Sequence, residues 1–147
     1  MGSTELSKRS KAVGVNKPLR VLLDTHIWLW YLLGDNKLSA NLQKIIASQE
    51  NELWLSPISV WETLILAEKG RLELNCEPIT WVKKYLRILD VKEARLTYEI
   101  VMLSRQLELP HQDPADRFIA ATAVHLDLAL ATVDTRLVGF DWLSTLQ

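Results

Sequence analysis

The sequence predicts an α/β sandwich built around a parallel sheet. Short apolar runs suited to buried strands alternate with longer segments of helical periodicity, and several of the helical segments carry recognisable start or stop residues. Of the 147 residues, 48% are hydrophobic, which is enough for the core of one domain of ordinary size. We expect a disordered polar lead over residues 1–18, favoured as a solvated tail over a basic arm that touches RNA, and one folded domain over residues 19–147.

The first half of this domain is expected to contain two strands and three helices. Each helix has a residue suited to one of its ends: Gly34 ends the first, Ser39 caps the second and Pro57 opens the third. The strands are short apolar runs of the kind that a sheet buries. The expected ranges are strands 19–24 and 52–56 and helices 26–34, 38–48 and 57–70.

The second half continues the alternation of helices and strands. Its clearest helix start is Asp113 as N-cap, with Pro114 in the first helical position. An amphipathic segment predicts one longer helix before it, and a short helical turn is expected between the last two strands. The expected ranges are helices 77–86, 92–107 and 113–127 and strands 87–91, 128–134 and 140–144.

Overall charge and cysteine content exclude several classes of protein. A net charge of −1 argues against a highly basic nucleic-acid binder, but it is compatible with an enzyme whose acidic site binds cations. Cys76 is the only cysteine, so a monomer has no disulfide framework and a reducing cytoplasm is the simplest setting. We expect no membrane association, because no apolar run approaches the length of a membrane span and the lead lacks a signal-peptide stretch.

Two acids lie where parallel sheets place their functional sites. Asp24 closes the first strand, and Asp134 follows the apolar part of the strand at 128–134. A single aspartate after a strand is usually a turn residue or a helix cap. Two such acids therefore indicate a site only modestly.

Two further acids lie in helices with an apolar face. Glu62 shares its helix face with Ile58 and Ile65, so we expect a buried carboxylate in a helix that is apolar almost all round. Asp116 lies three residues after the expected N-cap, Asp113, and shares the face that should meet the sheet. On this helix alone, interaction with the helix dipole or reciprocal capping is the favoured role of Asp116.

If these four acids converge, their repulsion requires protons or a divalent cation. Like charges about 4 Å apart repel by roughly 4 kcal/mol per pair at an effective dielectric constant near 20, whereas a domain is stable by only about 5 to 15 kcal/mol. Oxygen ligands suit Mg²⁺ or Mn²⁺. Such a metal can activate water and stabilise the leaving oxygen in phosphodiester hydrolysis.

Four segments, in order, resemble the motifs of the PIN-domain ribonucleases, in particular the VapC-type toxins of bacterial toxin–antitoxin pairs. The resemblance implies a three-layer α/β/α sandwich with a central, mainly parallel sheet, and an endoribonuclease dependent on Mg²⁺ or Mn²⁺. It also implies an RNA substrate, a cognate antitoxin that blocks the site, and a toxin homodimer. The segments, each with its implied metal-binding and catalytic acid, are LLDTHIWLW with Asp24, LSPISVWETLILAEKGRLEL with Glu62, LPHQDPADRFIAATA with Asp116, and LATVDTRL with Asp134.

Several neighbouring polar residues receive supporting roles. By its position in the motif, Thr132 is expected near the metal or its water. Thr25 and Ser59 are candidates for hydroxyls that support the acids, although a helix-start cap and a plain helix-face hydroxyl are open alternatives. Arg117 is expected to contact a substrate phosphate or an antitoxin carboxylate, with a weak surface ion pair as the alternative. Asp113 is expected mainly as a cap, with a possible place on the acidic rim.

Histidines and tryptophans are expected to be mainly structural. We assign structural or loop roles to His26 and His111, because in the PIN pattern the metal activates the water. At least half of one apolar group should pack in the core, and the rest would serve a dimer or antitoxin groove. That group is Trp28, Leu29, Trp30 and Leu32, and the further core candidates are Trp54, Trp61 and Trp81.

Two other classes of function remain open. An aspartyl-phosphate phosphatase or receiver domain also places acids at strand ends, although the sequence DTH after the first strand lacks a second aspartate two residues on. A stable acyl-phosphate on Asp24 would favour that class. A non-catalytic PIN-like module that binds RNA or protein is the other alternative, and the intact acids argue against it.

Overall fold

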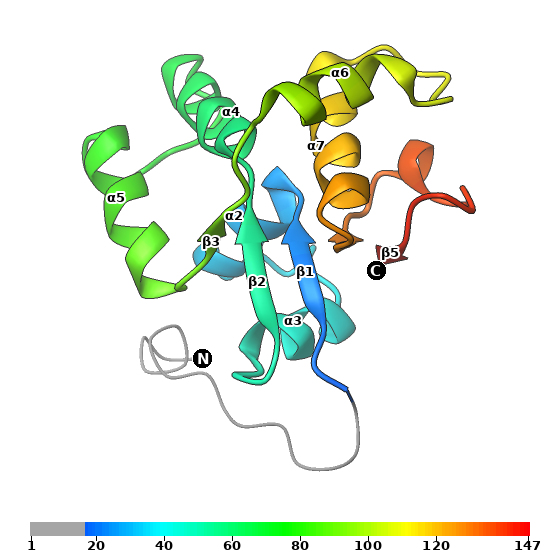
Figure 1. The fold of residues 1–147 in the computed structure, drawn as a ribbon. Helices are drawn as coiled ribbons and strands as arrows, with labels where there is room; N and C mark the ends of the chain where they lie inside the picture. The colour runs from blue at the N-terminus through cyan, green and yellow to red at the C-terminus, as the bar shows by residue number, and fades with distance from the viewer. Residues whose placement is uncertain (1–16) are drawn as a thin grey trace.

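Five parallel strands form one sheet within residues 17–147, the part of the chain that the computed structural model describes (Figure 1). The predicted lead lies almost entirely outside these residues. In the described range, no helix is long and apolar enough to cross a membrane. The strands, in the spatial order β3-β2-β1-β4-β5, are β1 (Arg20–Leu23), β2 (Glu52–Leu55), β3 (Lys92–Glu93), β4 (Ala129–Ala131) and β5 (Thr145–Leu146). The helices are α2 (Thr25–Leu33), α3 (Ala40–Ala47), α4 (Pro57–Glu68), α5 (Pro78–Ile88), α6 (Tyr98–Gln106), α7 (Pro114–His125) and the 3-10 turn η1 (Thr135–Leu137).

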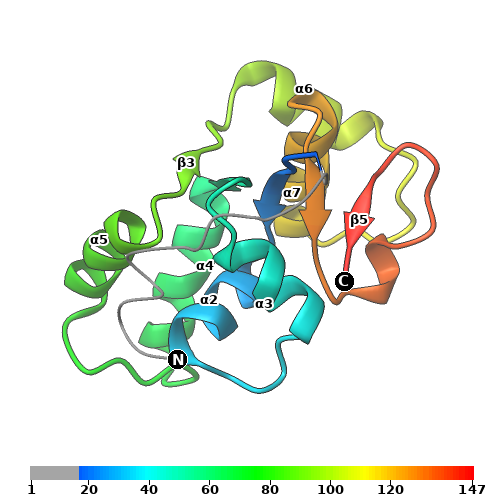
Figure 2. The same cartoon turned by 90° about the horizontal axis from the view of Figure 1, so that it is seen from below.

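Helices cover both faces of the sheet, which confirms the predicted three-layer α/β/α sandwich (Figures 1 and 2). Successive side chains of a strand point to opposite faces. Val21 and Leu23 of β1 therefore pack into one core cluster with α2, α3 and α5, whereas Leu22 packs into a second cluster with α7. All three side chains are fully buried, so β1 is the apolar centre of the molecule.

The strand order reverses between β1 and β4. From β1 the chain builds outward through β2 to β3, and it then returns to the other side of β1 to form β4 and β5. The last residues of β1 and β4, Leu23 and Ala131, are paired in register. Parallel α/β sheets bind ligands beyond the carboxyl ends of their strands at such a switch point. The topology therefore predicts a ligand site at the segments that follow β1 and β4.

Helix ends that were predicted from capping residues are confirmed. Gly34 ends α2 in the left-handed conformation, with φ 67°, which glycine adopts at little cost. Ser39 caps α3. Asp113 caps α7 by accepting hydrogen bonds from the backbone N–H groups of Ala115 and Asp116. The side chain of Asp116 is therefore not needed as a cap.

The strand predicted over residues 87–91 is wrong. Helix α5 continues to Ile88, and Asp90 then takes a left-handed conformation with φ 56°, which is incompatible with a strand. The edge strand is β3, which pairs with the end of β2. A strand of two residues is defined by its pairing partner, so apolar periodicity along its own sequence does not locate it.

Two further boundaries differ from the prediction for the same reason. The helix predicted over residues 92–107 begins only at Tyr98, where Thr97 is the N-cap. The last strand, predicted over residues 140–144, lies at Thr145–Leu146, where it pairs with β4. In both cases a contact with a neighbouring strand decides the boundary.

Helix α4 is less enclosed than its sequence suggested. Only Ser59 and Thr63 of this helix are buried, because it packs against α2, α5 and α7 and leaves one side to solvent. Trp61 is 56% exposed, so its prediction as a core residue is wrong. Glu62 is half-buried, which corrects the expectation that its carboxylate is buried.

The other tryptophans follow the prediction more closely. Trp81 is 3% exposed and meets Trp28 edge to face, with ring centroids 5.8 Å apart. Trp54 is half-buried against the second core cluster. Trp28, Leu29 and Leu32 are buried, which confirms that at least half of the apolar group on α2 packs in the core. Trp30 is only half-buried.

Arg117 is not available to a substrate, and its predicted contact with a phosphate or antitoxin is wrong. Only 4% of the residue is exposed, because the guanidinium donates hydrogen bonds to backbone carbonyls around the connection from α6 to α7. It is not in a surface ion pair either. The acceptors are the carbonyl oxygens of Ser104, Leu107, Leu109 and His111, at 2.7 to 3.2 Å. Arg117 therefore anchors the loop that leads to His111 and Asp113.

Replacing Arg117 with methionine is expected to destabilise the protein by at least about 3 kcal/mol. The substitution keeps a long side chain but leaves several buried carbonyls without donors. Urea denaturation of the metal-free protein measures the effect. Arg105→Met, at an exposed position of α6, is the matched control and should change the free energy of unfolding little. Equal stabilities of the two variants would contradict the anchoring role.

Candidate active site

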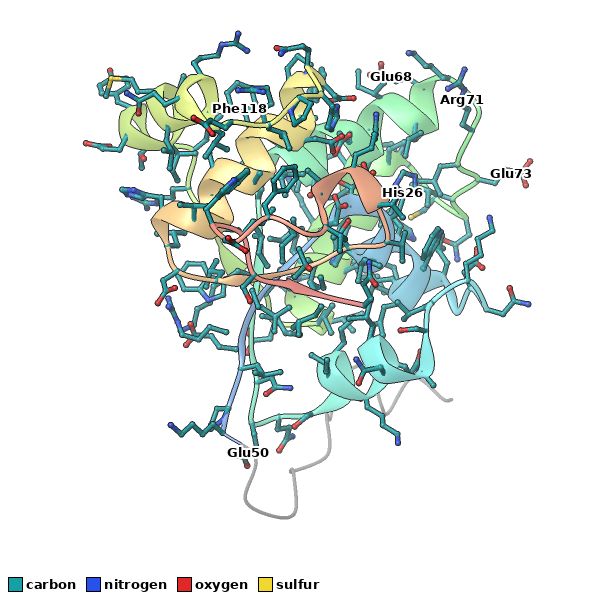
Figure 3. All side chains as sticks on the ribbon, turned by 90° about the vertical axis from the view of Figure 1, so that its right-hand side faces the viewer. His26, Glu50, Glu68, Arg71, Glu73 and Phe118 are labelled. Atoms are coloured by element: carbon teal, nitrogen blue, oxygen red, sulfur yellow. The ribbon has the colours of Figure 1, made fainter. Side chains whose placement is uncertain are left out.

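A cleft of about 330 Å³ lies beyond the carboxyl ends of β1 and β4, and all four predicted acids line it. They come from four separate parts of the chain. Figure 3 shows His26, which also lines this cleft, beside the turn η1. The acids are Asp24 after β1, Glu62 in α4, Asp116 in the first turn of α7, and Asp134 between β4 and η1.

Asp24 is fixed by the junction of β1 and α2. Its backbone N–H donates to the carbonyl of Ala131, 3.0 Å away, which extends the pairing of β1 with β4. One carboxylate oxygen caps α2 by accepting from the N–H of Thr25, and the other accepts from the hydroxyl of Thr132 at 2.7 Å. Burial raises the pKa of Asp24, and the bond from Thr132 opposes that rise.

Thr132 links the two acids that follow strands. Besides donating to Asp24, its hydroxyl oxygen accepts from the backbone N–H of Asp134 at 3.0 Å. The side chain is fully buried, so water does not compete for these bonds. Thr132 therefore lies beside two of the predicted metal-binding acids, and its place near a metal or its water stays a prediction.

Glu62 is held by a pair of buried hydroxyls. Thr25 donates to Glu62, and the hydroxyl oxygens of Thr25 and Ser59 are 2.9 Å apart. Because Thr25 has a single hydroxyl proton, donation to the carboxylate leaves Ser59 to donate to Thr25. Burial raises the pKa of Glu62, the bond from Thr25 lowers it, and the charge of Asp24 raises it further.

The carboxylate of Asp116 lies among like charges and lacks a short, well-aligned hydrogen bond from any residue that the structure describes. Burial first, and then the neighbouring carboxylates, of which Asp113 contributes most, raise its pKa to about 7. Two basic groups approach the same oxygen: Nε2 of His111 at 2.9 Å and Nη2 of Arg136 at 3.4 Å. The imidazole is not aligned as a hydrogen-bond partner, and the contact with Arg136 is long, so these contacts offset the repulsion only in part.

Arg136 is a site residue that the sequence analysis missed. Its guanidinium binds Asp134 with both arms, through Nε to Oδ1 at 3.0 Å and Nη2 to Oδ2 at 2.9 Å. This pairing lowers the pKa of Asp134. The signal in the sequence was the position of Arg136 two residues after Asp134, where an arginine can pair with the acid within one turn.

His111 is also more than the loop residue that was predicted. Single ligand atoms of His111, Asp116 and Asp134 all lie within 4.8 Å of one another, a separation that one cation can bridge. The spacing in HQDPAD was the available signal, because the loop before a helix start can fold back on the first turn. His26 lies in α2 rather than in a loop, and it is exposed at the mouth of the cleft.

The arrangement can be compared with known proteins. Residues 21–143 match the PIN domain family. The chain belongs to the PIN-domain family. Over 120 residues, which are 80% of this chain and 88% of the relative, it is 32% identical to ribonuclease VapC22 of Mycobacterium tuberculosis.

Solved structures share the PIN fold at lower sequence identity. A VapBC2 complex of Rickettsia felis bound to promoter DNA includes a similar chain, with TM-score 0.67, 15% identity, and coverage of 87% of this chain and 98% of that one. A DNA-bound VapBC of Salmonella typhimurium gives TM-score 0.63 and 19% identity, with coverage of 87% and 97%. At these identities the similarity shows the fold alone. The catalytic chemistry depends on the residues that line the cleft of this chain.

Asp116→Asn is expected to stabilise the metal-free protein above neutral pH by roughly 1 to 3 kcal/mol, after allowance for the nearby cations. Folded Asp116 keeps its proton up to about pH 7, whereas the unfolded group loses it near 3.8. The wild-type free energy of unfolding should therefore fall, relative to that of Asp116→Asn, as pH rises from about 4 to 7.

Urea denaturation in EDTA between pH 4 and 8 measures this difference. Asp141→Asn, at an exposed position outside the cleft, is the control and should follow the wild type. A pH profile for Asp116→Asn that is parallel to the wild type would contradict the elevated pKa.

Proposed function

We propose that this chain is a metal-dependent endoribonuclease that hydrolyses RNA phosphodiester bonds and acts as the toxin of a toxin–antitoxin pair. One observation carries the proposal: four carboxylates from distant parts of the chain line one cleft at the topological switch point of a PIN fold. The ribonuclease relative supports RNA as the substrate class.

The residues of the cleft suit Mg²⁺ or Mn²⁺. The donors are mostly carboxylate oxygens, which these hard cations prefer. The raised pKa values of Asp24, Glu62 and Asp116 reflect burial and, in part, the charge of neighbouring carboxylates, which a divalent cation would offset. When bound, the metal would lower the pKa of a water molecule and stabilise negative charge on the leaving oxygen.

The chain's own contribution is to hold the carboxylates in place. Thr132 and the start of α2 fix both oxygens of Asp24, which limits the directions in which that carboxylate can turn. The hydroxyl pair of Thr25 and Ser59 orients Glu62. Arg136, 58% exposed in its side chain, is the cation placed to meet a phosphate oxygen at the open side of the cleft.

Other functions fit the cleft less well. An aspartyl-phosphate enzyme is disfavoured because the sequence DTH after β1 lacks a second aspartate two residues after Asp24. A purely binding module would gain nothing from concentrating four acids at a cost in stability. Both alternatives predict RNA that stays intact in the presence of Mn²⁺.

A cognate antitoxin is the protein partner that we propose, acting with the toxin in the cytoplasm. The structural neighbours named VapBC are complexes rather than single proteins. Helices α2 and α4, which contact each other, leave Leu33 and Trp61 exposed by 45% and 56%. Apolar side chains of this size on adjoining helices suit a protein partner. A toxin homodimer remains part of the proposal.

RNA cleavage by the purified chain is expected to require Mn²⁺ or Mg²⁺, to stop in EDTA, and to fall at least about 100-fold in Asp24→Asn and Glu62→Gln. Glu73→Gln is the matched control, because Glu73 is exposed on the loop after α4 and outside the cleft (Figure 3). End-mapping of the RNA products measures cleavage, and calorimetry measures Mn²⁺ binding. Cleavage that persists in EDTA and in both site variants would reject the mechanism.

A further inference from the structure

One wall of the cleft is aromatic rather than acidic. His26 and Trp30 both line the cleft, with ring centroids 5.9 Å apart and ring planes inclined by 52°. They lie four residues apart in α2 and therefore share one face of this helix. Because Asp24 caps α2, the aromatic face begins within one turn of an acid of the proposed metal site.

A lysine lies over the ring of Trp30. Nζ of Lys37 lies 5.8 Å from the centroid of the Trp30 ring. Two hydrogen bonds fix the loop that carries Lys37. The backbone N–H of Asp35 donates to the carbonyl of Trp30, and the carboxylate of Asp35 accepts from the backbone N–H of Lys37. One cation, Lys37, therefore lies against Trp30, and another, Arg136, lines the cleft beside the acids.

Core packing does not account for the whole arrangement. Trp28, on the same helix, is fully buried and belongs to the core cluster. Trp30 only borders that cluster and keeps part of its surface in the cleft, while His26 is exposed. Two partly solvated rings beside cations and next to a phosphodiester-cleaving site form a suitable surface for an unpaired nucleobase.

We propose that His26 and Trp30 form a stacking subsite for one unpaired base of single-stranded RNA next to the scissile phosphate, with Lys37 contacting the backbone phosphate beyond it. The inference rests on the proposed ribonuclease function. Stacking uses the face that every base presents, so the subsite selects unpaired RNA rather than a particular base. Duplex RNA keeps its bases stacked on one another and is excluded from the subsite.

The test measures RNA binding separately from cleavage. Every protein carries Asp116→Asn to suppress hydrolysis, and the probe is a short, unstructured, fluorescein-labelled RNA in Mg²⁺. Fluorescence anisotropy gives its affinity. His26→Ala is the main variant because His26 is exposed and its loss leaves the core intact, and Trp30→Leu is the second. Tyr98→Leu, at an exposed aromatic residue of α6 outside the cleft, is the matched control.

Both variants are expected to weaken RNA binding roughly tenfold or more, the scale of losing one stacked base, while Tyr98→Leu binds like the parent. Aromatic replacements, His26→Tyr and Trp30→Phe, should restore most of the affinity. A series of probes, each with one base replaced by an abasic ribose, locates the contact. At one position of the probe, the abasic ribose should weaken binding to the parent. The same abasic probe should cause no further loss of affinity in His26→Ala.

The outcomes separate the subsite from the nuclease. RNA cleavage by the wild type, together with unchanged RNA affinity of His26→Ala and Trp30→Leu, would overturn the stacking subsite and leave the ribonuclease standing. An abasic penalty of equal size in parent and variants would also overturn it. Absence of RNA binding by the parent would overturn the stacking subsite, and absence of RNA cleavage by the wild type as well would overturn both proposals. If the abasic series locates a base contact at His26 but the wild type does not cleave RNA, the ribonuclease is overturned and the two rings remain a base-binding site only.

Discussion

Repulsion among carboxylates at the junction of β1 and β4 is the constraint around which this structure is organised. Each acid receives a different kind of compensation. Asp24 has a helix N–H and a buried hydroxyl, Glu62 has the hydroxyl of Thr25, and Asp134 has a two-armed arginine. Asp116 has only loose contacts, and burial together with the neighbouring carboxylates raises its pKa to about 7. The metal-free site therefore relieves part of the repulsion by keeping a proton on Asp116 up to about pH 7.

The fold keeps the two sides of this site in register through buried polar contacts rather than apolar packing alone. Thr132 joins the ends of β1 and β4. Arg117 donates hydrogen bonds to backbone carbonyls between α6 and α7, and these bonds fix the position of the loop before α7. An arginine next to a site acid in sequence points away from the site in space, because consecutive residues on a helix are about 100° apart. Its contribution to the site is therefore indirect.

The parts of the site that were predictable are those whose position follows from backbone geometry. Asp24 and Asp134 follow strands that a parallel sheet must align, and the cap at Asp113 fixed the start of α7. Arg136 and His111 were missed because their place depends on which way a loop side chain turns. The two-residue strand β3 and the exposure of Trp61 were missed because each depends on what a neighbouring element covers. The periodicity of a sequence indicates that a helix or strand has an apolar face, but it does not indicate whether another element packs on that face.

Helix α2 connects the two chemistries of the cleft. Its N-cap is an acid of the proposed metal site, and its second position and the residue one turn later are the two rings of the aromatic wall. A helix is rigid over this length, so the distance between the acid and the rings is set by the helical rise rather than by a flexible loop. The scissile phosphate and the neighbouring base would therefore be positioned by one element. Buried Trp28 and Leu29 hold that element against the sheet, which makes core packing on one face of α2 the support for recognition on the other.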